Sequence, residues 1–249
     1  MKKAILMMTL LAVGSLVSTA NAGGPISLTV RMGYSIGATS PLSMPASVTG
    51  IDAFRPTPSV LAGLDASFAL SYRWSVAAGL RIENKAMDAD ITTKGYHMEL
   101  RKGADQIEGL FTGHVSQQAT QWMLTLPVYA TLHLGPHWQV NAGPYLSLLI
   151  GKSFSGTASD GYLRQGGPTG PRINIGDTPD TWATYDFSDN MRSLQAGIML
   201  GADWQPLPRI GFSFGLSMGL TGIFPSNFAT VEQTLYPIYG NLGVFYRIN

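Results

Sequence analysis

The chain of 249 residues contains no cysteine, so disulfide bonds and a lipid-anchor cysteine are both excluded. Only 12% of its residues are charged, about half the share that is usual in soluble domains. Its 16 basic and 15 acidic residues give a formal charge of only +1, or −1 without Lys2 and Lys3, which argues against a nucleic-acid partner. Beyond its first residues it also lacks an apolar run of the roughly 20 residues that a transmembrane helix needs. A disulfide-rich domain and a helical membrane protein are therefore both disfavoured.

The first 22 residues have the pattern of an export signal. Lys2 and Lys3 precede an apolar run over 4–17, and the run is followed by Ala20-Asn21-Ala22, which fits the A-x-A cleavage pattern. The run is too short for a membrane-anchoring helix. We expect residues 1–22 to be a signal peptide and residues 23–249 to form the mature protein.

Eight segments alternate apolar residues with small or polar ones. In 210–221, apolar residues occupy the even positions, and glycine, serine or threonine the odd ones. This period of two puts the two sets on opposite faces of a strand. A bilayer core offers no water to unpaired backbone groups, so strands cross it only in a closed sheet. The predicted strands are 26–39, 58–73, 75–93, 115–134, 138–154, 192–204, 210–223 and 234–248.

The connections between these segments are alternately short and long. Tight turns are predicted around 73–74, 135–137 and 205–209, and longer loops rich in Gly, Pro, Ser and Asp at 40–57, 94–114, 155–191 and 224–233. Short periplasmic turns and longer extracellular loops are typical of bacterial outer-membrane barrels. The predicted fold is therefore all-β, a closed antiparallel transmembrane β-barrel of eight strands over 23–249. We expect it in the cell outer membrane, surrounded by lipid, with both mature termini periplasmic.

The alternation also predicts which side chains fill the lumen and which lie at the membrane interfaces. Three tryptophans lie at the tight turns and a fourth faces outward at the far end of its strand, as an interfacial aromatic girdle requires: Trp74, Trp138, Trp204 and Trp122. Charges of both signs face inward and are expected to form a lumen network: Arg31, Asp65, Arg81, Glu83, Asp203 and Arg247.

A soluble eight-stranded barrel of the lipocalin kind has the same periodicity but turns its apolar face inward. Its outer face would need lysine and glutamate at most alternate positions to stay soluble. Here the polar face consists mainly of Gly, Ser, Thr and Asn. This composition favours the membrane barrel.

The last strand resembles the C-terminal signal of outer-membrane barrels. Asn241 is followed by Gly243, and apolar or aromatic residues stand at Tyr246 and Ile248, although the chain has one further residue, Asn249. In such proteins this strand is read by the barrel-assembly machinery. The ending, together with the opening Met32-Gly33-Tyr34-Ser35, is similar to the outer-membrane β-barrel domain family common in Bacteroidota. That family is functionally mixed, so the resemblance implies architecture only.

Three functions remain open. Eight strands enclose little more space than their own side chains fill, which favours a plugged structural or surface-interaction barrel over a narrow small-solute channel. His114 and Ser116 share one strand face, similar to the His-x-Ser of outer-membrane lipid A deacylases, but no carboxylate follows about a dozen residues later. An outer-leaflet lipid-modifying enzyme is therefore the second alternative, after the channel, and we expect no enzyme, no cofactor and no metal. Loops 94–114 and 155–191 could bind an extracellular ligand or protein.

Overall fold

The computed structural model describes residues 26–102, 105–226, 228, 230 and 233–248. The predicted signal peptide lies outside these described residues. The described part is mostly strand, and it contains no helix long and apolar enough to cross a membrane. The strands are β1 (Ile26–Ser40), β2 (Val48–Pro56), β3 (Ser59–Ala69), β4 (Trp74–Lys102), β5 (Asp105–His133), β6 (Trp138–Gln165), β7 (Arg172–Ile175), β8 (Ala183–Asp186), β9 (Leu194–Trp204), β10 (Ile210–Gly219) and β11 (Tyr236–Arg247), with a 3-10 turn, η2 (Ser188–Asn190), between β8 and β9.

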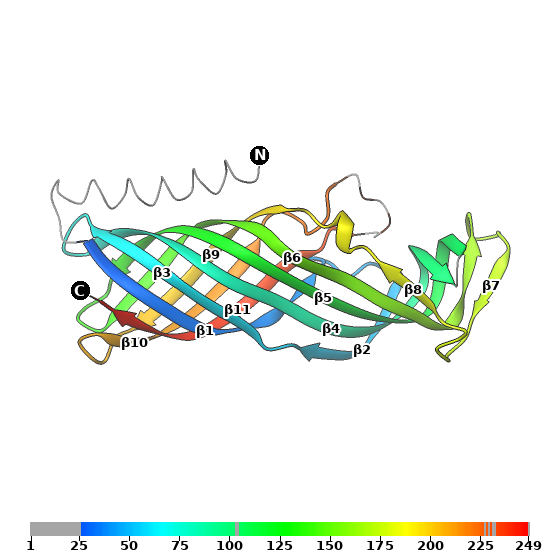
Figure 1. The fold of residues 1–249 in the computed structure, drawn as a ribbon, viewed down its shortest axis with the longest axis horizontal. Coiled ribbons are helices and arrows are strands. Elements are labelled where there is room, and N and C mark those ends of the chain that lie inside the picture. The colour runs from blue at the N-terminus through cyan, green and yellow to red at the C-terminus, as the bar shows by residue number, and fades with distance from the viewer. Residues whose placement is uncertain (1–25, 103–104, 227, 229, 231–232, 249) are drawn as a thin grey trace.

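Eight of these strands form a closed antiparallel ring in the order β1, β3, β4, β5, β6, β9, β10, β11. The ring closes where β1 pairs with β11, from Thr29 opposite Arg247 to Ser40 opposite Tyr236. Closure leaves these strands no unpaired edge within the barrel, as a lipid environment demands. The predicted all-β fold is confirmed, and Figure 1 shows the strands tilted around a common axis.

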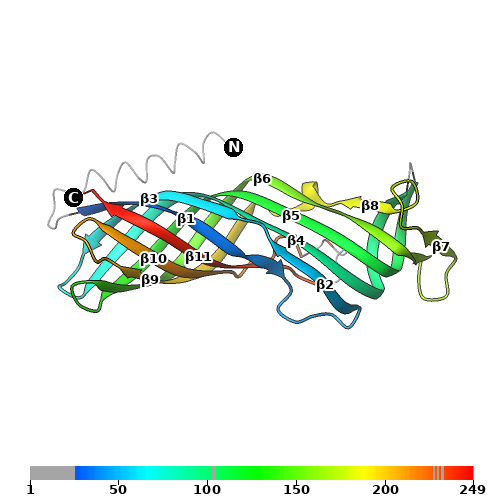
Figure 2. The ribbon, with the colours of Figure 1, turned by 90° about the horizontal axis from the view of Figure 1, so that it is seen from below.

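The three short connections lie together at one end of the barrel. They are the turns 70–73, 134–137 and 205–209. Figures 1 and 2 show the start of β1 and the C-terminus at this same end, which we call the turn end. The tight turns and their positions in the chain are therefore as predicted.

The predicted loops 94–114 and 155–191 were wrong over much of their length. β4 continues to Lys102 and β5 begins at Asp105, so these strands pair far beyond the ring, and β6 continues to Gln165. The alternation persists there, with Met98, Leu100 and Phe111 buried, although the content of Gly, Pro, Ser and Asp had suggested loops. Further short strands lie inside the predicted long loops, with β2 on β4 and β7 on β6.

The extension is itself wrapped into a tube. Thr184 of β8 lies opposite Thr157 of β6 and opposite Arg101 of β4, so β8 joins the two outer strands of the β4-β5-β6 sheet. A continuous apolar core fills this part, including Leu100, Phe111 and Leu163, which are fully buried. We call the ring from the turn end to the level of Trp122 the spanning half and the remainder the distal half.

Candidate functional site: the barrel lumen

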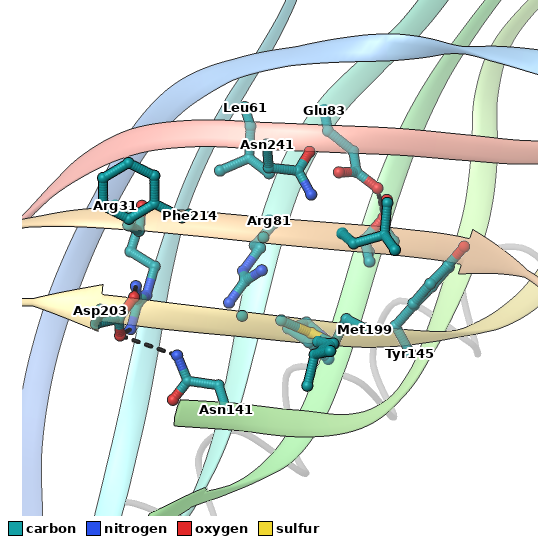
Figure 3. A pocket seen from close by; sticks show the side chains of 18 residues that line it. Arg31, Leu61, Arg81, Glu83, Asn141, Tyr145, Met199, Asp203, Phe214 and Asn241 are labelled. Atoms are coloured by element: carbon teal, nitrogen blue, oxygen red, sulfur yellow. Dashed lines mark hydrogen bonds and ion pairs between the residues drawn. The ribbon is translucent and has the colours of Figure 1, made fainter. Parts of the chain in front are cut away.

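A cluster of ion pairs occupies the spanning half near the turn end. Arg31 on β1 donates from Nε to Asp65 on β3 at 2.5 Å, and from Nη1 and Nη2 to the two oxygens of Asp203 on β9 at 2.9 and 2.7 Å. Arg81 on β4 donates from Nη2 to Asp65 at 3.0 Å. Both carboxylates are 2% exposed, so each depends on these cations for its charge to be tolerated. Figure 3 shows Arg31, Arg81 and Asp203 converging inside the ring.

Neutral donors complete the coordination of the two carboxylates. The Tyr129 hydroxyl donates to Asp65 at 2.8 Å, and the Asn141 amide donates to Asp203 at 3.0 Å. The guanidinium of Arg31 also lies 5.1 Å from the ring centroid of Phe245. This cluster therefore links β1, β3, β4, β5, β6 and β9 across the lumen, and it ties strands far apart in sequence.

A second polar layer lies closer to the middle of the barrel. Glu83 accepts a hydrogen bond from Thr125 at 2.7 Å, and its carboxylate is 3.4 Å from the ammonium of Lys85. Lys85 is 1% exposed and lies over the rings of Tyr145 and Tyr239, at 5.1 and 5.7 Å. The sequence reasoning missed Lys85, although it has the same strand parity as Arg81 and Glu83.

Amides and hydroxyls fill the rest of this second layer. Gln195 donates to Gln121 at 2.8 Å, and Gln121 donates to Thr39 at 3.3 Å. Both glutamines are buried. The large tyrosines fit because glycines face them: a Cβ at Gly197 would collide with the Tyr145 hydroxyl. Large and tiny side chains are thus interleaved to close a narrow lumen.

The expected charge network therefore has two separate parts. Arg31, Asp65, Arg81 and Asp203 are brought together, whereas Glu83 pairs with Lys85. Arg247 on β11 joins no ion pair within the described part of the chain. Its Nε is buried and has no hydrogen-bond partner there.

An aromatic cluster occupies the lumen at the base of the distal half. Phe154 on β6 packs edge-on against Phe224 at 5.0 Å between ring centroids, and Tyr185 on β8 stacks on Phe187 at 5.3 Å. Phe228 contacts both Phe187 and Phe224. The segments after β8 and β10 thus fold inward and cover the polar layers with apolar rings.

The end of β8 is anchored beneath this cluster. The backbone N–H of Ser188 donates to Asp186 at 2.9 Å. Hydrogen bonding from the side chain and the backbone of Ser188 holds the pKa of the Asp186 carboxyl below its usual range. The Ser188 hydroxyl accepts from the Phe154 backbone at 2.9 Å, which ties η2 to β6. Burial raises the pKa of the Tyr185 phenol, so this ring stays neutral inside the cluster.

The four tryptophans of the predicted girdle all lie on the outer surface. Trp74, Trp138 and Trp204 are at the turn end, and Trp138 stacks on Trp204 at 6.1 Å. Trp122 is 40% exposed where the outer face of β5 changes from apolar to polar residues. Their membrane role stays a prediction.

The residues of the predicted assembly signal alternate between the two faces of β11. Tyr246 and Ile248 are exposed on the outer face. Asn241 turns inward and accepts a hydrogen bond from Ser35 at 2.7 Å, and Gly243 lies opposite Gly33 at the closing seam. Recognition of this strand by assembly factors stays a prediction.

Two carboxylates lie near His114, where the sequence analysis had found none, and both come from other strands. Asp52 of β2 lies 3.3 Å from His114 Nδ1, and Asp160 of β6 lies 3.9 Å from Nε2. Ser116 shares the outer face, but no hydrogen bond joins it to His114. His114 is eight residues beyond Trp122, about 26 Å along the strand, which is far from lipid acyl chains. This geometry does not support a lipid hydrolase.

No group of three or more His, Asp or Glu side chains suited to a metal ion occurs in the described part of the chain. The acidic residues of 155–191 do not form such a group. The positions that stand out chemically are therefore those of the lumen.

The chain matches the outer membrane protein β-barrel domain family over residues 18–225. No curated protein matches it. Among solved structures, it is similar to Ail, the attachment invasion locus protein of Yersinia pestis (8% identity, 90% of this chain and 99% of that chain covered, TM-score 0.36). It is also similar to Neisserial surface protein A (10%, 90% and 98%, TM-score 0.36) and to an outer membrane channel of Pseudomonas putida F1 (11%, 91% and 97%, TM-score 0.30).

Identities and TM-scores this low say nothing about what the chain does. The match to the family covers most of the chain, and the closed ring of eight antiparallel strands agrees with it. The chain belongs to the outer membrane protein β-barrel domain family and is a protein of the outer membrane.

Proposed function

We propose that this protein is a plugged barrel with a structural or surface-interaction role in the outer membrane. The observation that carries the proposal is the filling of the lumen by successive layers of side chains. The Arg31 cluster is followed by the layer around Lys85, and that layer by the aromatic cluster around Phe154. Between the Arg31 cluster and the Lys85 layer, a cavity of only about 60 Å³ remains, room for about two waters.

The lumen layers differ in chemistry, so no single substitution is expected to open the lumen to ions. Ions would have to displace the paired charges first and then cross an apolar layer, where desolvation is costly. This argues against the alternative of a narrow small-solute channel. Lipid of the outer membrane contacts the outer face, and the last strand carries the features that the assembly machinery reads.

Conductance in planar bilayers tests the plug. The unmodified barrel should give no steady unitary current. The double variant Arg81→Ala, Arg247→Ala should stay silent as well, because the Lys85 layer and the aromatic cluster remain. A large, steady current through the unmodified barrel would favour the channel instead.

The orientation is part of the proposal: turn end and termini in the periplasm, distal half outside the cell. Because the chain has no cysteine, single substitutions report accessibility to an impermeant thiol reagent on intact cells. Thr169→Cys in the connection between β6 and β7 should react and Pro136→Cys in a short turn should not. Labelling of Pro136→Cys alone would invert the orientation.

A surface-interaction role is supported by two arginines of the distal half. Arg164 and Arg172 lie directly opposite each other on β6 and β7, an arrangement in which like charges repel. Arg172 lies 4.1 Å and Arg164 5.7 Å from the ring centroid of Tyr162. Neither joins an ion pair among the described residues, so both remain available to an anionic partner outside the cell.

Binding of intact cells to beads coated with dextran sulfate tests this role. The double variant Arg164→Ser, Arg172→Ser should bind several-fold less than the unmodified protein. Arg55→Ser, which removes an arginine already paired with Asp90 at 3.1 Å, is the matched control and should bind normally. Equal binding by all three would remove the support for this role.

A further inference from the structure

A cavity of about 400 Å³ lies in the lumen at the turn end. Six strands, β1, β3, β4, β5, β6 and β11, contribute to its wall. Most of the residues that line it are polar, among them Arg31, Arg247, His133, Gln139 and Thr29. This volume is within the range of small-molecule sites in proteins.

The two carboxylates nearest to this cavity are already largely occupied by other groups. Asp203 accepts two hydrogen bonds from Arg31 and one from Asn141. Asp65 accepts from Arg31, Arg81 and Tyr129. Little capacity remains in either carboxylate for a third guanidinium.

Arg247 is that third guanidinium. It lines the cavity, and within the described residues it joins no ion pair and its buried Nε finds no acceptor. Among the described residues at the turn end, Arg31, Arg81 and Arg247 share the two carboxylates of Asp65 and Asp203, and the nearby Glu83 is paired with Lys85, which leaves one positive charge in excess. A partly buried cation is costly without a counter-charge.

We propose that this cavity binds the oxyanion of a small solute, a carboxylate or a phosphate group, through Arg247. The planar guanidinium fork matches both groups and can donate two parallel hydrogen bonds. Gln139 and His133 line the same cavity and carry further N–H groups for the ligand. The site does not depend on the barrel being plugged or on its orientation; if the turn end faces the periplasm, as proposed above, the ligand is a periplasmic solute.

Thermal unfolding of the purified full barrel in detergent micelles tests the site, with sodium phosphate or sodium acetate compared with sodium chloride at equal ionic strength. The melting temperature should rise saturably with at least one oxyanion, by about 5–10 °C at a hundred times its Kd. A rise with phosphate alone identifies a phosphate ligand, and a rise with acetate identifies a carboxylate. Arg247→Gln should abolish the rise, whereas Arg73→Gln, in an exposed turn at the same end, should retain it.

The same rise in Arg247→Gln, or no rise in the unmodified barrel with either oxyanion, would overturn the proposal. If Arg247→Gln does not fold, modification of the unmodified barrel with phenylglyoxal gives a second readout by mass spectrometry. Phosphate or acetate should protect Arg247 from the reagent and leave Arg73 reactive. Equal modification of Arg247 with and without both oxyanions would also overturn it.

Discussion

The spanning and distal halves have opposite polarity on the same three strands. Along β4, the inward residues Arg81, Glu83 and Lys85 are followed at the same parity by Met87, and further on by the buried Met98 and Leu100. On β5, the outward face changes from Val128, Leu126 and Leu124 to Thr120, Gln118 and Ser116 beyond Trp122. The spanning half is polar inside and apolar outside, and the distal half is the reverse.

This reversal teaches that the alternation identifies two faces without identifying their environments. Lipid around the spanning half accepts an apolar outer face, so polar groups must be satisfied inside the lumen. Water around the distal half requires a polar outer face, so its interior is an ordinary apolar core. We predict that the level at which polarity reverses, near Trp122, is one boundary of the membrane-embedded band.

The largest effect is expected from cutting the charged cluster of the spanning half. Asp65→Ala leaves Arg81 without an ion pair, which should lower the free energy of unfolding in micelles by about 3–5 kcal/mol. Adding Arg81→Ala should recover part of this loss, since it removes the orphaned cation. Urea titrations followed by tryptophan fluorescence measure both, with the exposed Asp177→Ala as control. If the double variant lost as much free energy of unfolding as the two single variants together, the result would contradict the pairing.

The apolar core of the distal half should respond differently. Leu163→Ala removes a fully buried side chain and should cost about 2–5 kcal/mol, but the loss should be confined to the extension. Trypsin should then cleave at Arg164 and Arg172 faster, while the gel mobility of the unheated spanning barrel stays unchanged. Leu42→Ala, at a side chain that is 64% exposed, is the control. Loss of the folded spanning barrel would show that the two halves unfold together.

Substitutions on the outer face test the predicted boundary between lipid and water, and their expected effect is the smallest of the three predictions. Leu216→Lys on β10 places a charge in the lipid-facing band and should cost about 2–4 kcal/mol. Thr157→Lys also points outward, on β6 of the distal half, and should cost almost nothing because water surrounds it. Refolding yield and urea stability in lipid vesicles distinguish the two. Equal costs for the two substitutions would show that the predicted boundary does not lie between these two positions.

Much of the ring could be predicted from the chain because its signals are local. Alternation sets the strands, and Gly-Pro and Pro-rich segments set the turns at 135–137 and 205–209. The extension of β4 to Lys102 was missed because the Gly, Pro, Ser and Asp content of the segments beyond the predicted strands favours loops. Lys85 was missed although its parity places it on the inward face, two residues from Glu83, which the sequence had already placed in the lumen.

The sequence by itself determined the number of strands in the ring, the facing of these strands in the spanning half and the grouping of the short turns at one end, because each depends on neighbours within one strand or turn. Only the tertiary structure decided the partners in the lumen. Arg31 meets Asp65 across 34 positions and Asp203 across 172, and Arg247 meets neither. Closing the ring fixes the strand register, and register decides which inward charges are neutralised and which one is left facing a cavity.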